Sequence, residues 1–148
     1  MHYTDSLIGH PMKLEKKSNG VQQYRSYKGD DFNDATGKII QAAIEVHKNL
    51  GPGFMEVTYQ RALALELRQL GLDFDREVEM DVYYKDQKID KRRVDFLVED
   101  CMVEIKGKSQ LEDEHYIQTL SYLKASNMKL ALLINFGAKK VQIKRFVR

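Results

Sequence analysis

Hydrophobic residues in the second quarter of the chain recur at steps of three and four, a pattern that predicts two amphipathic helices. The first is expected to begin near Asn33 or Asp34, because either side chain can cap a helix, and to end at the Gly-Pro-Gly run of residues 51–53. The second is predicted from Phe54 to Leu70, with Gly71 as its C-terminal cap.

Beyond these helices the pattern changes to a period of two. Apolar and polar residues alternate from Val78 to Tyr84, which predicts a strand with one buried face. Further strands are predicted at 92–98, 101–106, 130–136 and 141–147, and a helix at 111–126. The order predicts an α/β fold with a mixed β-sheet flanked by helices, in which an antiparallel meander precedes a right-handed parallel strand–helix–strand unit.

Residues 1–33 differ from the remainder because they are polar and have no sustained period. We expect a flexible or poorly ordered N-terminal arm at 1–33 and one domain at 34–148, since 148 residues suit a single core. No apolar run approaches the roughly 20 residues that a membrane span needs, so no membrane partner is expected. The single cysteine, Cys101, excludes an intramolecular disulfide and favours a cytoplasmic location.

The net charge of +2 is too small to indicate a nucleic-acid partner by itself. The distribution of charge along the chain is more informative. Residues 101–148 hold 9 Lys and Arg against 4 Asp and Glu, a net charge of +5. A basic C-terminal third can attract phosphate groups, although a solvated lysine-rich surface explains the same charges equally well.

The segment from Arg93 to Lys106 carries the most informative charged residues. If Glu99 and Asp100 form a two-residue turn, the strands on either side pair in a fixed register. One face is then wholly apolar, and its pairs are Val98–Cys101, Phe96–Val103 and Val94–Ile105. The pairs on the other face are Leu97–Met102, Asp95–Glu104 and Arg93–Lys106.

In that register Asp95 and Glu104 are two carboxylates about 5 Å apart on one face, which destabilises a sheet through repulsion. A divalent cation between them removes this cost, and Mg²⁺ and Mn²⁺ prefer such oxygen ligands. Lys106 projects from the same face, where it can orient or deprotonate a water molecule or offset charge on a phosphate. The alternative is a solvated hairpin face on which Arg93 and Lys106 are simple counter-ions.

Glu56 is a further acidic candidate. It shares a helical stripe with Tyr59, Leu63 and Leu67 that is expected to pack inward, and a buried carboxylate needs a partner. A metal ion is one such partner, whereas a salt bridge or a favourable place near the helix N-terminus is the alternative.

A polar row on the predicted helix 111–126 consists of His115, Gln118 and Tyr122. Gln118 can hydrogen-bond a phosphate or hold a catalytic group in place, and Tyr122 can contact a nucleic-acid backbone. An ordinary amphipathic boundary explains the row as well, most clearly for His115 and Tyr122.

Together these residues resemble one family. The pattern that names the GxxExxY proteins, small members of the PD-(D/E)XK nuclease superfamily, resembles the segment Gly53-Phe54-Met55-Glu56-Val57-Thr58-Tyr59. The similarity runs from about Asp34 to Arg148 and includes residues 46–53, the Asp95 segment, Glu104-Ile105-Lys106 and Leu133-Ile134-Asn135-Phe136-Gly137. Gln118 and Tyr122 also resemble the Gln-x-x-x-Tyr motif of exonuclease branches. Val94 is a departure, since the superfamily name has proline there.

The resemblance implies a restriction-endonuclease-like core and a nuclease that uses Mg²⁺ or Mn²⁺ on a nucleic acid, DNA before RNA. The implied metal ligands are Glu56, Asp95 and Glu104, and the implied catalytic residues are Lys106 and Gln118. The predicted nucleic-acid contacts are Arg93, Lys108 and Tyr122. Competing hypotheses are a non-catalytic nucleic-acid-binding module and a partner-binding protein that retain this fold, and the sequence also allows a homodimer.

Overall fold

The computed structural model describes residues 34–148 and, before them, residues 6–7, 10–11, 15–16, 22–23 and 32. Two short antiparallel sheets precede the first helix. Their pairs are β1 (Ser6–Leu7) with β2 (His10–Pro11), and β3 (Glu15–Lys16) with β4 (Gln22–Gln23). The flexible arm expected at 1–33 falls largely outside the described residues, so it stays a prediction.

The first helix, α1 (Ala35–Leu50), begins at one of the two predicted positions. Asp34 is its N-cap, and the Asp34 Oδ1 atom accepts a hydrogen bond of 3.0 Å from the backbone N–H of Thr36. The helix ends at Gly51, whose φ of 66° is a left-handed conformation that glycine adopts at little cost. Local cap chemistry therefore determines both ends.

The second helix, α2 (Glu56–Gln69), begins two residues later than predicted, because Met55 still has an extended backbone. At its other end the predicted cap, Gly71, has a φ of 70°. The N–H groups of Gly71 and Leu72 donate to carbonyl groups of the last helical turn, which forms a Schellman motif.

No helix in the described part of the chain is long and apolar enough to cross a lipid bilayer.

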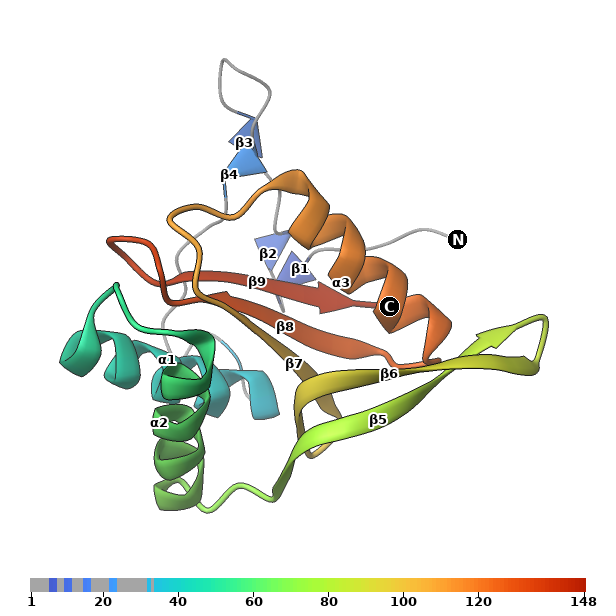
Figure 1. Cartoon of the computed structure of the whole chain (residues 1–148), viewed down its shortest axis with the longest axis horizontal. Helices are drawn as coiled ribbons and strands as arrows, with labels where there is room; N and C mark the ends of the chain where they lie inside the picture. Colours follow the sequence, from blue (N-terminus) through green and yellow to red (C-terminus); the bar gives the residue numbers. More distant parts are fainter. Residues whose placement is uncertain (1–5, 8–9, 12–14, 17–21, 24–31, 33) are drawn as a thin grey trace.

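Five strands of the described chain form one sheet in the order β5-β6-β7-β8-β9. The strands are β5 (Phe74–Tyr84), β6 (Gln87–Val98), β7 (Cys101–Lys106), β8 (Leu130–Asn135) and β9 (Gln142–Val147). The helix α3 (Asp113–Ala125) lies between β7 and β8 in the chain. β7 and β8 are parallel, and the other neighbours are antiparallel. The predicted order of elements and the mixed sheet are confirmed, with α1 and α2 against one face and α3 against the other (Figure 1).

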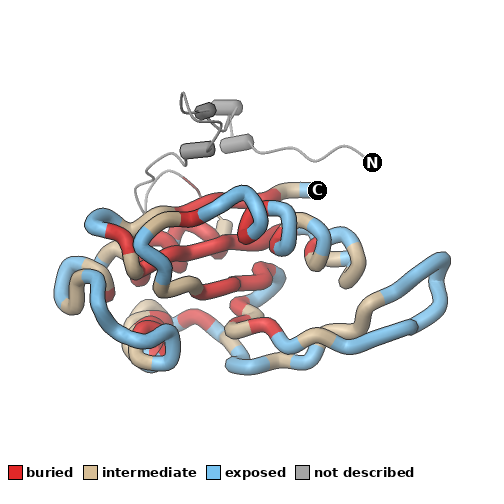
Figure 2. The backbone as a smooth tube through the Cα atoms, turned by 45° about the horizontal axis from the view of Figure 1, so that its top comes forward, coloured by how far each residue is buried: buried red, intermediate tan, exposed pale blue. Residues whose placement is uncertain are grey.

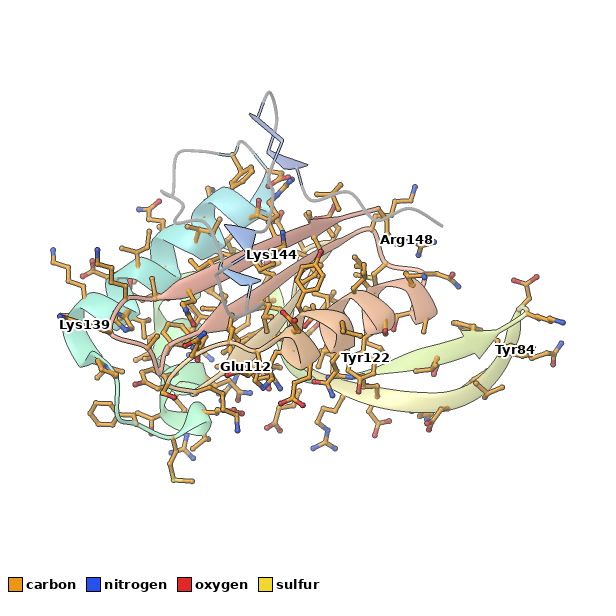
Figure 3. All side chains as sticks on the ribbon, turned by 90° about the horizontal axis from the view of Figure 1, so that it is seen from above. Tyr84, Glu112, Tyr122, Lys139, Lys144 and Arg148 are labelled. Carbon is orange, nitrogen blue, oxygen red and sulfur yellow. The ribbon has the colours of Figure 1, made fainter. Side chains whose placement is uncertain are left out.

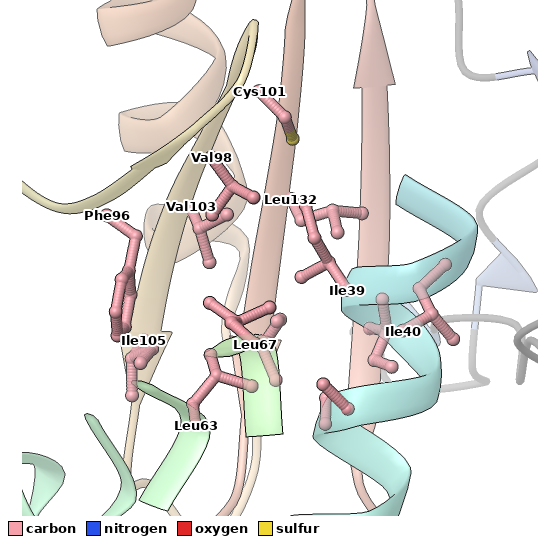
Figure 4. Packing of buried hydrophobic residues seen from close by; sticks show 14 of the residues in the cluster. Ile39, Ile40, Leu63, Leu67, Phe96, Val98, Cys101, Val103, Ile105 and Leu132 are labelled. Carbon is pink, nitrogen blue, oxygen red and sulfur yellow. The ribbon is translucent and has the colours of Figure 1, made fainter. Parts of the chain in front are cut away.

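The apolar residues of the sheet divide into two clusters, one on each face. The cluster under α1 and α2 includes Phe96, Val103 and Ile105 (Figure 4), and the cluster under α3 includes Val94 and Met102. Burial is concentrated in the central strands, whereas the helix surfaces and the outer hairpin are exposed (Figure 2). β8 is buried along its whole length because both faces are covered, which explains its continuous apolar run.

β5 and β6 form a hairpin that is longer than the sequence predicted and that extends beyond the other strands (Figure 1). Its outer part is rich in charged residues, so hydrophobic alternation gives no signal there. The backbone conformation of the connecting residues forms the turn. Lys85 and Asp86 have φ values of 47° and 64°, as in a type I′ turn.

The hairpin changes its buried face part-way along its length. Val94 belongs to the cluster under α3, whereas Phe96, two residues later, belongs to the opposite cluster. Unbroken alternation would place both on one face, so β6 is irregular at Asp95. On β5 the residue that faces Asp95 is Glu77, which has a φ of 51°. Glu77 and Asp95 are not paired in the ladder, although the residues on either side of them are. The prediction that Val94 and Ile105 share one apolar face is therefore wrong.

After β8 the chain passes directly over the loop that follows β7. A Cβ atom at Gly137 would lie 2.5 Å from the carbonyl carbon of Gly107 and 2.5 Å from the carbonyl oxygen of Lys108. These are backbone atoms, which cannot rotate away as a flexible side chain can. Only glycine fits at this position without movement of the loop.

Gly137→Ala is therefore expected to destabilise the fold by about 1–3 kcal/mol, the range typical of overpacking. Gly107→Ala is the matched control, because the nearest atom to its added Cβ is the Glu56 Cγ at 3.4 Å, an ordinary contact. Urea denaturation measures the free energy of unfolding of both variants. Wild-type stability of Gly137→Ala would contradict the close approach of the two loops.

Candidate active site

β6 and β7 pair near their turn and then separate. The paired residues are Val98–Cys101, Leu97–Met102 and Phe96–Val103, as the two-residue turn predicts. Beyond them the Asp95 Oδ2 atom accepts a hydrogen bond of 2.7 Å from the backbone N–H of Ile105. A side-chain oxygen thus takes the place of a backbone carbonyl, and the predicted cross-strand pair of Asp95 and Glu104 is absent from the register.

The second oxygen of Asp95 is held from α2. Gln60 is buried on that helix and donates through Nε2 to the Asp95 Oδ1 at 3.3 Å, while its own Oε1 accepts from the Arg76 Nη2 at 2.6 Å. Burial raises the pKa of Asp95 above its usual value, the hydrogen bond from Ile105 opposes this shift, and the negative charge of Glu56 adds to it.

Glu104 lies on β7 and is 5% exposed. The Arg92 guanidinium binds both of its oxygens, with Nη1 to Oε1 at 3.0 Å and Nη2 to Oε2 at 3.4 Å. Burial raises the pKa of Glu104 to about 7, because desolvation outweighs the attraction of Arg92 and the charge of Asp95 adds to the shift. The carboxyl group therefore titrates close to neutral pH.

Arg92 connects Glu104 to α3. Its guanidinium carbon lies 3.3 Å from the centre of the Tyr122 ring, on the side of α3 toward the β5–β6 hairpin (Figure 3). The Tyr122 hydroxyl accepts a hydrogen bond of 3.1 Å from the Gln118 Nε2. The structure thus links the two predicted residues of α3 to Glu104 through an arginine that the sequence analysis did not single out.

Lys106 ends β7 and lines a pocket on the α3 side of the sheet. The other lining residues are Lys108, Glu114, His115 and Gln118. His115 has a structural role there, because its Nδ1 accepts a hydrogen bond of 3.0 Å from the backbone N–H of Glu112 and forms part of the α3 capping box. Burial and the charge of Lys106 lower the pKa of His115. The two lysines and an amide suit an anionic group such as a phosphate.

Glu56 is exposed, contrary to the prediction that its helical stripe packs inward. It is the first residue of α2, and the buried stripe begins only at Tyr59, one turn later. The Glu56 Oε1 atom accepts a hydrogen bond of 3.3 Å from the backbone N–H of Gly107. The side chain nevertheless lies beside the loop that follows Lys106.

Arg93 is not opposite Lys106 as predicted. Its Nη1 lies 3.9 Å from the Glu77 Oε2, and 63% of its side chain is exposed. The irregularity at Asp95 exchanges the faces of β6, so Arg92 rather than Arg93 reaches Glu104. A nucleic-acid contact by Arg93 stays a prediction.

The three acidic candidates surround the ends of β6 and β7 without converging on one point. Glu56 acts electrostatically on Asp95, and Asp95 acts on Glu104. Within the described residues, no three His, Cys, Asp or Glu side chains are grouped closely enough to hold a metal ion.

A family model described as the PD-(D/E)XK nuclease superfamily matches residues 33–146. The chain belongs to this superfamily. The predicted restriction-endonuclease-like α/β fold is confirmed by this match and by the mixed sheet. Comparisons with curated proteins and with solved structures gave no match. Membership in the narrower GxxExxY group stays a prediction.

The residues that the sequence analysis assigned to the superfamily's pattern lie on two neighbouring strands. Asp95 stands on β6, and Glu104 and Lys106 stand on β7, two residues apart. Sheet alternation places Glu104 and Lys106 on the same face, the one that α3 covers.

Asn135 positions the loop that follows Lys106, a role that the sequence analysis missed. The Asn135 Oδ1 accepts from the Lys108 N–H at 2.8 Å, and its Nδ2 donates to the Lys108 carbonyl at 2.8 Å and to the Gln142 Oε1 at 2.9 Å. Its side chain is fully buried. An amide inside an otherwise apolar strand was the available signal, because buried amides need partners.

The pKa of Glu104 generates a prediction about stability. The folded-state pKa, about 7, lies above the ordinary value of 4.5, so the folded protein binds this proton more tightly than the unfolded chain. The tighter proton binding stabilises the folded protein. This stabilisation is complete below pH 4.5 and is lost as the pH rises through 7. Without divalent metal, the wild type should lose up to roughly 3 kcal/mol of stability through Glu104 across this window.

Denaturation with urea at several pH values measures this slope. Glu104→Gln should remove most of it, whereas the matched control Glu99→Gln, at an exposed turn position, should retain it. The same slope in the wild type and in Glu104→Gln would refute the assignment.

Proposed function

We infer that this protein is a metal-dependent nuclease that hydrolyses phosphodiester bonds, with DNA preferred to RNA as the substrate. The observation that carries the proposal is that a buried carboxylate, Glu104, and a half-buried one, Asp95, lie near Lys106 where β6 and β7 separate. Burial raises the pKa of both carboxyls, so the fold maintains acidic groups where they are unfavourable without a cation. Membership in the superfamily supports the class of reaction.

The donor set fits a magnesium-type cation. All the candidate ligands are carboxylate oxygens, and Mg²⁺ usually keeps several waters and needs only one or two protein carboxylates besides the substrate phosphate. Asp95 and Glu104 would hold the cation, and Glu56 would support it from the start of α2. A bound Mg²⁺ or Mn²⁺ supplies Lewis acidity that activates water and offsets negative charge on a phosphate.

Lys106 is the proposed catalytic residue that acts on the attacking water and on the charge of the phosphate. It shares a face with Glu104 and lines the pocket that also contains Lys108 and Gln118. Its ammonium group orients the attacking water or neutralises charge that develops on the phosphate. Gln118, whose amide reaches the Tyr122 hydroxyl, steadies this arrangement from α3.

The substrate backbone is proposed to approach on the α3 side of the sheet. Lys108 is exposed beside Lys106 and can bind a phosphate oxygen, and Tyr122 borders the same region. Arg93, which is exposed on the other face of β6, would contact a more distant phosphate. Such contacts supply affinity without sequence information.

A non-catalytic nucleic-acid-binding module is the alternative, and one observation favours it. Glu104 already has a counter-ion, Arg92, and a carboxylate that is neutralised within the protein has less need of a cation. Metal binding and turnover separate the two functions.

Mg²⁺ or Mn²⁺ is expected to raise the melting temperature of the wild type, because a ligand that binds only the folded state stabilises it by about 2.7 kcal/mol at a hundred times its Kd. Asp95→Asn should stabilise the metal-free protein slightly, because it removes a charge beside Glu104 while the amide oxygen of the new side chain can still accept from the Ile105 N–H. It should also abolish the metal effect.

Asp100→Asn, in the exposed turn at the other end of the hairpin, is the matched control and should respond to metal as the wild type does. Calorimetric titration and thermal melts give the two readouts. An equal metal response in the wild type and in Asp95→Asn would exclude this site.

Lys106→Ala should fold, bind metal and bind DNA, yet lose cleavage by about 10²-fold or more, the scale of removing one acid–base or electrostatic group. Glu104→Ala should lose both metal binding and cleavage. The measurement is a panel of single-stranded, double-stranded and branched DNA and RNA, each with Mg²⁺ and with Mn²⁺.

Lys38→Ala is the charge-matched control, because Lys38 lies near Glu99 and Asp100 at the opposite end of β7 from Lys106. It should cleave as the wild type does. If the wild type and Lys106→Ala cannot be distinguished on any substrate of the panel, the binding module replaces the enzyme.

A further inference from the structure

Arg92 occupies an unusual place for a counter-ion. Its two terminal nitrogens bind the two oxygens of Glu104, at 3.0 Å and 3.4 Å. On its other side the guanidinium lies against the Tyr122 ring, 3.3 Å from the ring centre. The Arg92 side chain is 17% exposed and the Glu104 side chain 7%, so the ion pair is largely shielded from water.

Both oxygens of Glu104 are already hydrogen-bonded on the side that faces Arg92. Both carboxylate oxygens accept a charge-assisted hydrogen bond from the same planar group, which is the bidentate arrangement that arginine favours. Each oxygen keeps a second lone pair, but a divalent cation bound there would lie close to the guanidinium, and the two positive charges repel. A cation that uses Glu104 as a ligand therefore competes with Arg92 for the carboxylate. The metal-free site is closed by an internal cation.

The tyrosine ring gives the guanidinium a second attractive surface. A cation over an aromatic face is stabilised without a carboxylate, and the Tyr122 hydroxyl is itself fixed by Gln118. Arg92 can thus release Glu104 and still remain against α3. Arg93, its neighbour, is instead mostly exposed beside Glu77.

We propose that Arg92 is a positioning residue that holds the Glu104 carboxylate ordered in the metal-free protein and is displaced from it when a divalent cation binds. The proposal rests on the proposed function, because it takes Glu104 as a ligand of the cation. A static ion pair is the competing explanation, in which the cation uses Asp95 alone and Arg92 never moves.

The test follows the Arg92 guanidinium by NMR in protein labelled with ¹⁵N-arginine, together with calorimetric titration of Mg²⁺. In the metal-free protein the Arg92 side-chain signal should be slowed in exchange with water and shifted by the Tyr122 ring. The signal is assigned by its absence from Arg92→Lys or, if that variant does not fold, by its contacts with the Tyr122 ring protons.

Saturating Mg²⁺ should remove the slow exchange of the Arg92 signal with water, with the same midpoint as the calorimetric isotherm, while the shift caused by the Tyr122 ring is retained. Glu104→Gln should weaken the protection before any metal is added, because its neutral amide offers only one acceptor. The Arg93 signal is the internal control and should not change with Mg²⁺.

Each outcome has a separate meaning. Metal binding together with loss of the Arg92 protection from exchange supports the displacement. Metal binding with an unchanged Arg92 signal overturns the displacement and leaves the nuclease proposal intact. No heat of binding and no stabilisation by Mg²⁺ or Mn²⁺ overturns the displacement and the metal site together.

Discussion

The hydrogen bond from the Ile105 N–H to the Asp95 carboxylate is the constraint on which the site depends. It ends the β6–β7 ladder with a side chain, so the two strands separate and the acidic group stays at the point of separation. The accompanying irregularity exchanges the faces of β6, which brings Arg92 to Glu104 and places Val94 under α3. One carboxylate thus organises both faces of the hairpin.

Most of the fold could be predicted because its signals are local and strong. Helical spacing and the caps Asp34 and Gly71 located α1 and α2, and the continuous apolar run identified β8 as a strand covered on both faces. The outer β5–β6 hairpin was underestimated. It is held by backbone pairing and by surface ion pairs such as Lys88–Asp81, and neither leaves a hydrophobic pattern.

The site was predictable only where the chain itself brings residues together. Asp95, Glu104 and Lys106 belong to one short hairpin, so a turn of two residues was enough to place them near one another. Arg92 was missed because the face exchange needs a left-handed φ at Glu77, which no local pattern indicates. The helical period similarly predicted the side of α2 on which Glu56 lies. It could not predict how far along the helix the core extends, and Glu56 lies beyond that point.

The hydrogen bonds between the Asn135 side chain and the Lys108 backbone determine how the loop after β7 can open. Residues 107–112 form no helix or strand, yet both main-chain polar groups of Lys108 are bonded to a side chain of β8, a strand that is paired on both sides. The N–H of Leu111 is bonded in turn to Gln142 of β9. The loop therefore belongs to the same cooperative unfolding unit as the sheet rather than to a separate mobile segment. The backbone that carries Lys106 is in place before any ligand arrives, so little ordering entropy remains to be lost on binding.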